Sequence, residues 1–277
     1  MNTLLCKTEY DSLKEVILCP PEYMSIKEVI NSIQAHYKQD NIHIPTALKQ
    51  HQGLKQTLTS LGVHVVELQA DRHYPEQVFT RDIGFVIDDI LYLASLERPI
   101  RQGEEMYLKQ YAEENQLSFQ KMTEGTIEGG DVIIDGEDVF IGISSRTSAS
   151  LIERFKQNHP GKTIHPIHFD DSYLHLDCVF NPISEDIALI YTDAIEPEFV
   201  SLLKQKYTCI EVSKREQFSL AVNVLSLGEG KVIVLPENTE TNAQLRAKGF
   251  DLYEVPFSEI IKSGGSFRCV TMPLHRA

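Results

Sequence analysis

The sequence predicts an α/β fold in which one ββαβ unit is repeated around a centre with pseudo-fivefold symmetry. Two observations support this prediction: segments with one hairpin-like pattern recur at near-equal spacing, and helix-like segments followed by short strands separate them. Repeats that cannot bury their apolar faces alone pack on one another, and radial closure removes exposed sheet edges. We therefore expect a closed ring of repeats.

Each hairpin-like segment has a polar residue, an apolar run, a turn and a second apolar run. The segments begin at Asp82, Asp131, Asp177 and Asn223, so the gaps are 49, 46 and 46 residues. Their turns contain DD, DG, NP and GEG, which are typical of turns between β-branched and aromatic strands. A further step of 46 residues reaches Cys269, which is followed by the strand-like run VTMPL.

No second strand-like run follows VTMPL, but the run KEVILC at residues 14–19 has the composition of a strand. We expect these two runs to pair and to close the ring. The equivalent positions of the repeats would then point toward the axis. The sequence thus predicts a central cavity in which several carboxylates face one thiol.

Helix-like segments lie between the hairpins, and local signals mark their ends. Gly62 and Gly249 suit helix C-termini, and Pro197 suits a first helical position. Ser150 and Glu153 have the spacing of a capping box. The expected helices cover residues 54–61, 151–155, 197–203 and 239–248, and short strands are expected after them at residues 63–68, 163–167, 209–212 and 251–255.

Composition and charge restrict the partners and the compartment. The net charge of −14 argues against nucleic acid and is compatible with a cationic substrate. The five cysteines form no CxxC pair, which is typical of reduced thiols and indicates a cytoplasmic protein. The longest apolar runs are too short for a membrane span. We expect a single catalytic domain over residues 1–277, and we leave a homodimer open.

Cys269 is the candidate nucleophile, in the segment SGGSFRC. Carboxylates alone would raise its pKa, but a cationic substrate held among them would favour the reactive thiolate. The alternative is that Cys269 is a small buried apolar residue. Cys178 follows Asp177, and on a strand its side chain would face the opposite way and serve in packing.

His175 and Glu128 are the candidate acid/base pair. In the segment LHLD, His175 precedes Asp177 by two residues, so on a strand both side chains would share one face. A histidine there can protonate a leaving amine and then deprotonate water. Glu128, in EGGD, would orient this histidine or bind substrate N–H groups. The alternatives are a core histidine and a turn glutamate.

The substrate class follows from the carboxylates. A guanidinium has five N–H donors in a planar fork, which paired carboxylates match in a bidentate manner. A cluster of aspartates and glutamates around a thiol therefore indicates a guanidine or an amidine rather than an ester or a peptide. We expect a small cationic guanidino compound as the substrate.

Four motifs in this order resemble those of the guanidino-group-modifying, or pentein, superfamily: FTRD (79–82), EGGD (128–131), LHLD (174–177) and GGSFRC (264–269). Its members include arginine deiminases, dimethylarginine dimethylaminohydrolases, agmatine deiminases and amidinotransferases. The resemblance implies a five-bladed α/β propeller and a reaction that needs no cofactor and no metal. The segments YPEQVFTRD, LERPIRQGEE and SSRTS are most similar to the dimethylaminohydrolases.

The resemblance also implies roles for individual residues. It implies that Cys269 is the nucleophile, His175 the acid/base and Glu128 its partner, that Asp82 and Glu76 line the guanidinium pocket, and that Arg101 and Arg146 hold the carboxylate of an amino-acid substrate. Asp177 departs from the dimethylaminohydrolases and matches the arginine deiminases. Two carboxylates, Asp82 and Asp177, suit a guanidinium that is unsubstituted or substituted on one terminal nitrogen.

The expected function is cysteine-dependent hydrolysis of arginine or an N-substituted arginine through a covalent thiouronium, which leaves a ureido product. Three alternatives stay open. An amidinotransferase would pass the amidino group to an amine, and a non-catalytic member of the fold would only bind a ligand. A metal hydrolase could use the histidines and aspartates of HPIHFDDSYLHLD (165–177).

Overall fold

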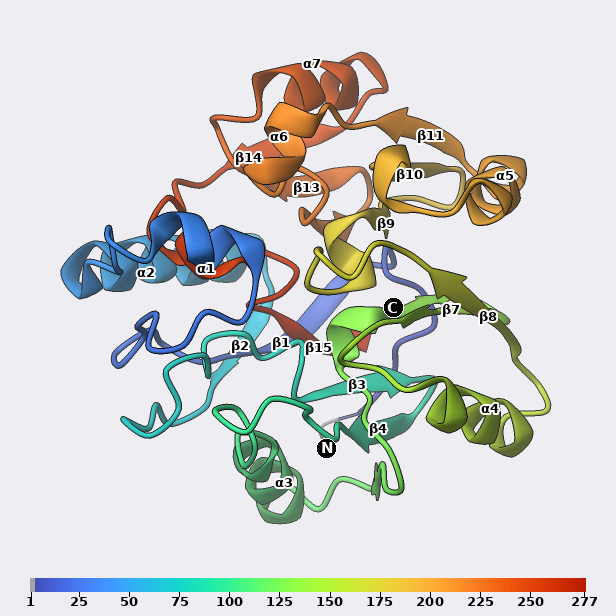
Figure 1. Ribbon diagram of the computed structural model, residues 1–277, viewed down its shortest axis with the longest axis horizontal. Helices are drawn as coiled ribbons and strands as arrows, with labels where there is room; N and C mark the ends of the chain where they lie inside the picture. Colours follow the sequence, from blue (N-terminus) through green and yellow to red (C-terminus); the bar gives the residue numbers. More distant parts are fainter. Residues whose placement is uncertain (1–2) are drawn as a thin grey trace.

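The computed structural model describes residues 3–277, which form five three-stranded sheets. The sheets surround a common centre, and the helices α2, α3, α4, α5 and α7 lie at the periphery (Figure 1). This arrangement is consistent with the predicted five-bladed α/β propeller. No helix within residues 3–277 has the length and apolar character needed to cross a lipid bilayer.

Every sheet has the same topology: an antiparallel pair of strands and a third strand that runs parallel to its neighbour. In four sheets the pair is a sequential hairpin and a helix returns the chain to the third strand. These sheets are β3 (Gly84–Ile87), β4 (Ile90–Leu93) and β5 (Phe119–Lys121); β6 (Val132–Asp135), β7 (Asp138–Ile143) and β8 (Thr163–His168); β9 (Phe180–Pro182), β10 (Ile187–Ile190) and β11 (Thr208–Glu211); and β12 (Leu225–Gly228), β13 (Lys231–Val234) and β14 (Asp251–Glu254).

The fifth sheet closes the ring as predicted. The strand β15 (Met272–Arg276) pairs antiparallel with β1 (Leu13–Leu18), and β1 pairs parallel with β2 (His64–Glu67). The first and last strands of the described chain therefore lie in one sheet, in the segments where the sequence predicted two pairing strands.

The predicted helices are confirmed, and the described residues 3–277 form three more. The helices are α1 (Ser32–Tyr37), α2 (Ile44–Ser60), α3 (Glu105–Glu114), α4 (Ala149–Asn158), α5 (Pro197–Lys206), α6 (Lys214–Phe218) and α7 (Thr239–Ala247). Gly62 and Gly249 have positive φ angles of 84° and 90°, as expected just beyond α2 and α7. The capping box is wrong: Ser148 is the N-cap of α4, and Ser150 lies within the first turn.

The core lies between neighbouring sheets rather than at the centre of the ring. One apolar cluster, for example, joins Phe85 of β3 to Val132 of β6 and to Phe155 of α4. Apolar residues are thus buried between adjacent units. The polar first residues of the repeats lie at the centre. Because buried polar groups are costly when unpaired, we expect these residues to form hydrogen bonds and ion pairs with one another.

Short 3₁₀ turns precede two of the hairpins near the centre: η1 (Gly129–Asp131) and η2 (Leu176–Cys178). The prediction that LHLD forms a strand is therefore wrong. His175 precedes η2 as its N-cap, and both Asp177 and Cys178 belong to the turn. Side chains that are adjacent in a turn do not point in opposite directions as they do in a strand.

Candidate active site

The first residues of the five repeats all lie at the centre, and all five are fully buried. Hydrogen bonds link each repeat to the next: Gly129 N–H to Asp82 O (3.3 Å), Leu176 N–H to Asp131 Oδ1 (2.8 Å), Asn223 Nδ2 to Asp177 O (3.1 Å), Cys269 N–H to Asn223 Oδ1 (3.1 Å) and Arg81 N–H to Cys269 O (3.0 Å). These bonds form a closed ring. Each repeat therefore helps to fix the position of the next repeat, and with it the side chain that lies at the centre.

Asp82, Glu128 and His175 form one side of the centre, which we call the histidine group. His175 Nε2 lies 2.7 Å from Glu128 Oε2, and its Nδ1 lies 3.5 Å from Asp82 Oδ1. Burial disfavours the imidazolium, but Asp82, Glu128 and Asp131 outweigh burial and raise the pKa of His175 to about 10. The structure therefore brings His175 and Glu128 together as a charged pair.

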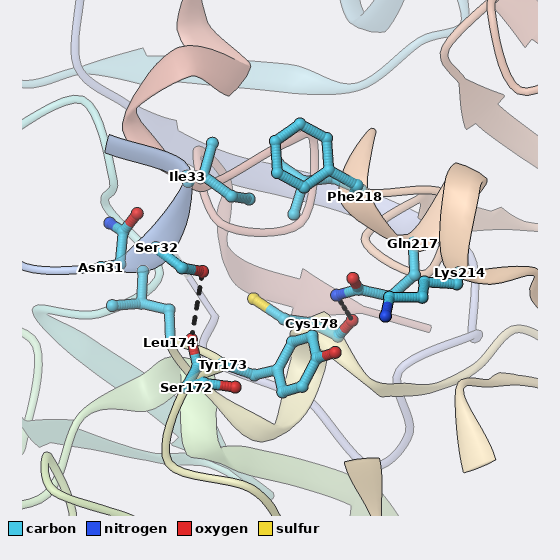
Figure 2. A pocket seen from close by; sticks show the side chains of 12 residues that line it. Asn31, Ser32, Ile33, Ser172, Tyr173, Leu174, Cys178, Lys214, Gln217 and Phe218 are labelled. Atoms are coloured by element: carbon cyan, nitrogen blue, oxygen red, sulfur yellow. Dashed lines mark hydrogen bonds between the residues drawn. The ribbon is translucent and has the colours of Figure 1, made fainter. Parts of the chain in front are cut away.

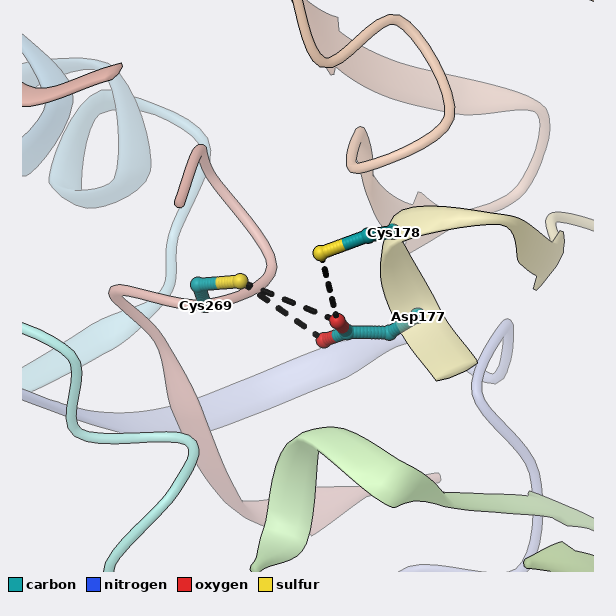
Figure 3. A group of neighbouring side chains, drawn as sticks. All are labelled: Asp177, Cys178 and Cys269. Carbon is teal, nitrogen blue, oxygen red and sulfur yellow. Dashed lines mark hydrogen bonds between the residues drawn. The ribbon is translucent and has the colours of Figure 1, made fainter. Parts of the chain in front are cut away.

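Asp177, Cys178 and Cys269 form the other side, which we call the thiol group (Figure 3). Cys269 Sγ lies 3.8 Å from both carboxylate oxygens of Asp177, and Cys178 Sγ lies 3.6 Å from Asp177 Oδ1. The Cys178 thiol, burial and the Asp177 carboxylate raise the pKa of Cys269 well above its ordinary value. Burial also raises the pKa of Asp177.

The prediction that Cys178 faces away from the site is wrong. It rested on a strand at residues 174–178, whereas η2 turns the Cys178 thiol toward Asp177 and Cys269. The sequence contains no signal that distinguishes these two geometries, because a short apolar segment around LHLD fits either one.

Asn223 and Arg268 support the thiol group, and sequence reasoning assigned neither of them a role. Asn223 Oδ1 accepts hydrogen bonds from the N–H groups of Ser266 and Cys269, both at 3.1 Å, and so fixes the loop that carries the candidate nucleophile. Arg268 Nε lies 3.2 Å from Asp177 Oδ2. The sequence analysis placed Asn223 at the fourth repeat position, but that spacing carries no signal for its two hydrogen bonds to the loop of Cys269.

Two glycines in the motifs allow the site to close around these groups. A Cβ on Gly130 would lie 2.6 Å from His175 Nδ1 and 2.8 Å from Asp82 Oδ1. A Cβ on Gly265 would lie 2.8 Å from the Cβ of Cys269. All three separations are too short for non-bonded heavy atoms, so a larger residue at either position would displace the candidate catalytic side chains.

Arg101 has a different partner from the one that the resemblance implied. It is buried and binds Asp82 Oδ2 through Nη1 at 2.5 Å and Glu104 Oε2 through Nη2 at 2.7 Å. The guanidinium of Arg101 is therefore paired with the carboxylate of Asp82, which was expected to bind the guanidinium of a substrate. In this structure Asp82 is paired with a cation from the protein itself.

Arg146 and Glu76 flank the centre. Arg146 lies 3.5 Å from Glu128 Oε2, donates to Ile30 O, and lines a cavity of about 40 Å³ together with Arg98. The carboxylate of Glu76 accepts hydrogen bonds from Gln34 and Ser263, and burial raises its pKa to about 8. The expected carboxylate-binding cation Arg146 thus faces a small cavity, but its neighbour there is Arg98 rather than Arg101.

Within residues 3–277, two groups have ligand atoms close enough to hold a metal ion: Asp82, Glu128 and His175, and Asp177, Cys178 and Cys269. These are the histidine group and the thiol group. The stretch 165–177 does not assemble as a ligand set, because His165 binds Asp138 at 2.8 Å while His168 is exposed on β8. Of this stretch only His175 and Asp177 belong to the two groups, one to each, so the predicted ligand set from HPIHFDDSYLHLD is not formed within residues 3–277.

Sequence comparisons identify relatives over nearly the whole chain. A family model described as N,N dimethylarginine dimethylhydrolase, eukaryotic, matches residues 20–276. The uncharacterised protein YkgA of Bacillus subtilis is 51% identical over 272 residues, which are 98% of this chain and 95% of the relative. The arginine deiminase of Streptococcus uberis is 28% identical over 73% of this chain and 61% of its own length.

Structural comparisons show the same fold in two solved proteins. The N-terminal domain of ArgZ, a cyanobacterial arginine dihydrolase solved with bound product, has a TM-score of 0.87 at 24% identity and covers 96% of this chain and 98% of that domain. SxtG, an amidinotransferase from Microseira wollei, has a TM-score of 0.86 at 18% identity and covers 99% and 97%. From its motifs and the match over residues 20–276, the chain belongs to the N,N-dimethylarginine dimethylhydrolase family of the guanidino-group-modifying superfamily.

Proposed function

We propose that the protein hydrolyses the guanidino group of arginine or of an arginine substituted on one terminal nitrogen. The observation that carries this proposal is the pairing of a charged His175–Glu128 couple with a buried thiol, Cys269, across one centre lined by Asp82 and Asp177. An acid/base, a nucleophile and two carboxylates are the groups that the reaction requires.

Binding comes first in the proposed mechanism. The substrate guanidinium displaces Arg101 from Asp82 and lies between Asp82 and Asp177, where each carboxylate can accept its N–H groups. The bound cation lowers the pKa of Cys269, because positive charge beside the sulfur favours the thiolate. The nucleophile is therefore generated only when a substrate of the right charge is present.

Attack and hydrolysis follow. The Cys269 thiolate adds to the central guanidino carbon, and His175, which its neighbouring carboxylates keep protonated, donates a proton to the departing amine or ammonia. The product of this step is a thiouronium on Cys269. The neutral His175 then takes a proton from water, which attacks the same carbon and releases a ureido product with the thiol regenerated.

Transfer of the amidino group to an amine is the second candidate. It shares every step up to the thiouronium, and the similar fold of the amidinotransferase SxtG favours keeping it under test. Incubation with substrate and a large excess of a primary amine separates the two: hydrolysis yields a ureido product whose amount is independent of the amine, whereas transfer yields a new guanidine.

A substrate panel tests the assignment to arginine. Arginine, methylarginines, agmatine and guanidino acids should be assayed for ureido product and released amine. We expect carboxylate-bearing arginines to be preferred. Clear preference for agmatine over every carboxylate-bearing compound would overturn the substrate class and leave the thiouronium chemistry standing.

Arg146→Ala sharpens the panel. If Arg146 binds the substrate carboxylate, the variant should raise KM for arginine by about tenfold or more, as expected for a lost charge-assisted hydrogen bond, and scarcely change KM for agmatine. Arg98→Ala is the matched variant, because Arg98 lines the same cavity. An equal rise of KM for arginine and agmatine in Arg146→Ala would remove the carboxylate role.

A further inference from the structure

A second cysteine, Cys178, lies beside the candidate nucleophile and has no part in the proposed reaction. The sulfur atoms of Cys178 and Cys269 and a carboxylate oxygen of Asp177 all lie within 4.8 Å of one another. Asp177 Oδ1 is 3.6 Å from the Cys178 sulfur and 3.8 Å from the Cys269 sulfur. One carboxylate oxygen therefore faces both thiols and can accept a proton from either one.

Cys178 also faces a cavity. Its side chain lines a cavity of about 150 Å³ together with Ile33, Tyr173 and Phe218 (Figure 2). Since a water molecule takes up about 30 Å³ of the liquid, this cavity has room for a small oxidant such as hydrogen peroxide. The cavity thus reaches one of the two thiols, and the sulfur of the second lies within 4.8 Å of the first.

We propose that Cys178 and Cys269 form a reversible disulfide when the protein meets hydrogen peroxide, and that this disulfide switches the enzyme off while protecting Cys269 from irreversible oxidation. Formation of the Cys178–Cys269 disulfide does not depend on the proposed function. The loss of activity on oxidation does rest on the proposed function. A disulfide has an S–S length of about 2 Å, so the sulfurs must approach by less than about 3 Å.

The reaction proceeds in two balanced steps. The Cys178 sulfur attacks one oxygen of hydrogen peroxide, the O–O bond breaks, and the departing hydroxide leaves as water with the thiol proton, which gives a sulfenic acid. The Cys269 sulfur then attacks the Cys178 sulfur. The S–O bond breaks, the hydroxyl leaves as a second water with the Cys269 proton, and the S–S bond forms. Two thiols lose two electrons, and one peroxide is reduced to two waters.

Asp177 is the group that can relay both protons. Burial raises its pKa, so it is a better proton acceptor than an ordinary aspartate, and it contacts both sulfurs. The surroundings also restrain the reaction, because the Cys178 thiol, burial and neighbouring negative charge raise the pKa of Cys269 and keep it largely a thiol in the absence of substrate.

The test is titration of the reduced protein with hydrogen peroxide in the presence of a metal chelator. We expect a mass loss of about 2 Da, the mass of two hydrogen atoms, and a disulfide-linked pair of peptides containing Cys178 and Cys269. Turnover of arginine should fall in parallel and should return on reduction with dithiothreitol. The linked peptides are measured without any assay, so their absence refutes this proposal alone, whereas linked peptides in a protein inactive on every guanidine would refute the proposed function alone.

Variants complete the design, with each rate normalised to that of the untreated variant. Cys178→Ser and Cys178→Ala should form no linked peptides, and peroxide should inactivate them without recovery on reduction. Cys209→Ser is the matched control, because Cys209 is partly exposed and lies outside the thiol group, and it should behave as the unaltered protein. Reversible inactivation in Cys178→Ser, or oxidation of Cys269 to the sulfinic acid without linked peptides in the unaltered protein, would overturn the proposal.

Discussion

The histidine group and the thiol group face each other across one centre, but they differ in how their charges are matched. In the histidine group, His175 lies between two carboxylates, and burial of Glu128 is outweighed by its contacts with His175 and nearby arginines, which lower its pKa to about 2. In the thiol group, burial raises the pKa of Asp177, and the Cys178 thiol, burial and like charge raise that of Cys269. The neighbouring charges thus favour the ionised forms of His175 and Glu128 on one side, whereas on the other side the pKa values of both Asp177 and Cys269 are raised.

This difference indicates what each side contributes. A preformed imidazolium can donate a proton as soon as an amine departs, whereas a thiol among carboxylates becomes a nucleophile only when a cation is added. Arg101 is already bound to Asp82 on the histidine side, while Arg268 reaches only one oxygen of Asp177 on the thiol side. In the proposed mechanism, the cation that activates Cys269 therefore comes largely from the substrate.

Among the changes that leave the candidate nucleophile in place, the largest effect should follow from removing the preformed acid. His175→Asn should lower kcat by about 10²-fold or more, the usual scale for a lost general acid/base, while the melting temperature stays near that of the unaltered protein. Turnover and thermal unfolding are the measurements. Glu128→Gln is the matched variant and should cause a similar but smaller loss, because His175 keeps Asp82. A stable His175→Asn variant with normal kinetics would remove the histidine group from the mechanism.

An intermediate effect should appear in the reactivity of the thiol group. Since the pKa of Cys269 is raised, its alkylation by iodoacetamide should be slow at neutral pH and should accelerate as the pH rises. A bound, unreactive guanidinium or amidine should lower that pKa and accelerate alkylation at neutral pH by about tenfold or more, because the thiolate fraction rises as the pKa falls. The rate is followed by mass on the peptide that contains Cys269.

The control for alkylation is a neutral ligand of similar size, such as a urea, which should cause no acceleration. If the thiol reacts rapidly at neutral pH without any cation, then the two groups do not differ in the way described, and activation by the substrate is excluded.

The smallest effect should come from the hydrogen bonds that hold the thiol group in place. Asn223→Ala removes the acceptor of the Ser266 and Cys269 N–H groups and should cost about 1–3 kcal/mol of unfolding free energy, the usual cost of buried polar groups left unpaired. Asn223→Asp keeps the acceptor but replaces the Nδ2 donor to Asp177 O by a buried carboxylate oxygen, so it should lose more than Asn223→Ala. Denaturant unfolding of both variants tests this ranking, and equal stability of Asn223→Ala and the unaltered protein would contradict it.

The repeat and its centre could be predicted because they depend on spacing. The positions 82, 131, 177, 223 and 269 lie at regular steps, and β1 pairs with β15 where the apolar runs indicated. The side-chain contacts at the centre could not be predicted from spacing. Arg101 and Asp82 are 19 positions apart in the sequence, and their pairing depends on how one long side chain is directed.

The thiol group shows the same limit more clearly. Asp177 and Cys178 were predicted to diverge, because alternation along a strand is the simplest interpretation of a short apolar segment. The turn η2 instead brings the Cys178 thiol close to the Asp177 carboxylate. The assignments that did not depend on local geometry, such as the identity of the candidate nucleophile, are unaffected, and they remain predictions until turnover is measured.

The most direct test of the central claim is an acid quench during turnover, followed by mass analysis of the peptide that contains Cys269. We predict an added amidino-derived mass that appears only with substrate, decays as the ureido product forms, and is absent in Cys269→Ser, which should not turn over. Undiminished turnover by Cys269→Ser, or a substrate-dependent mass on any other residue, would contradict the assignment of Cys269 as the nucleophile.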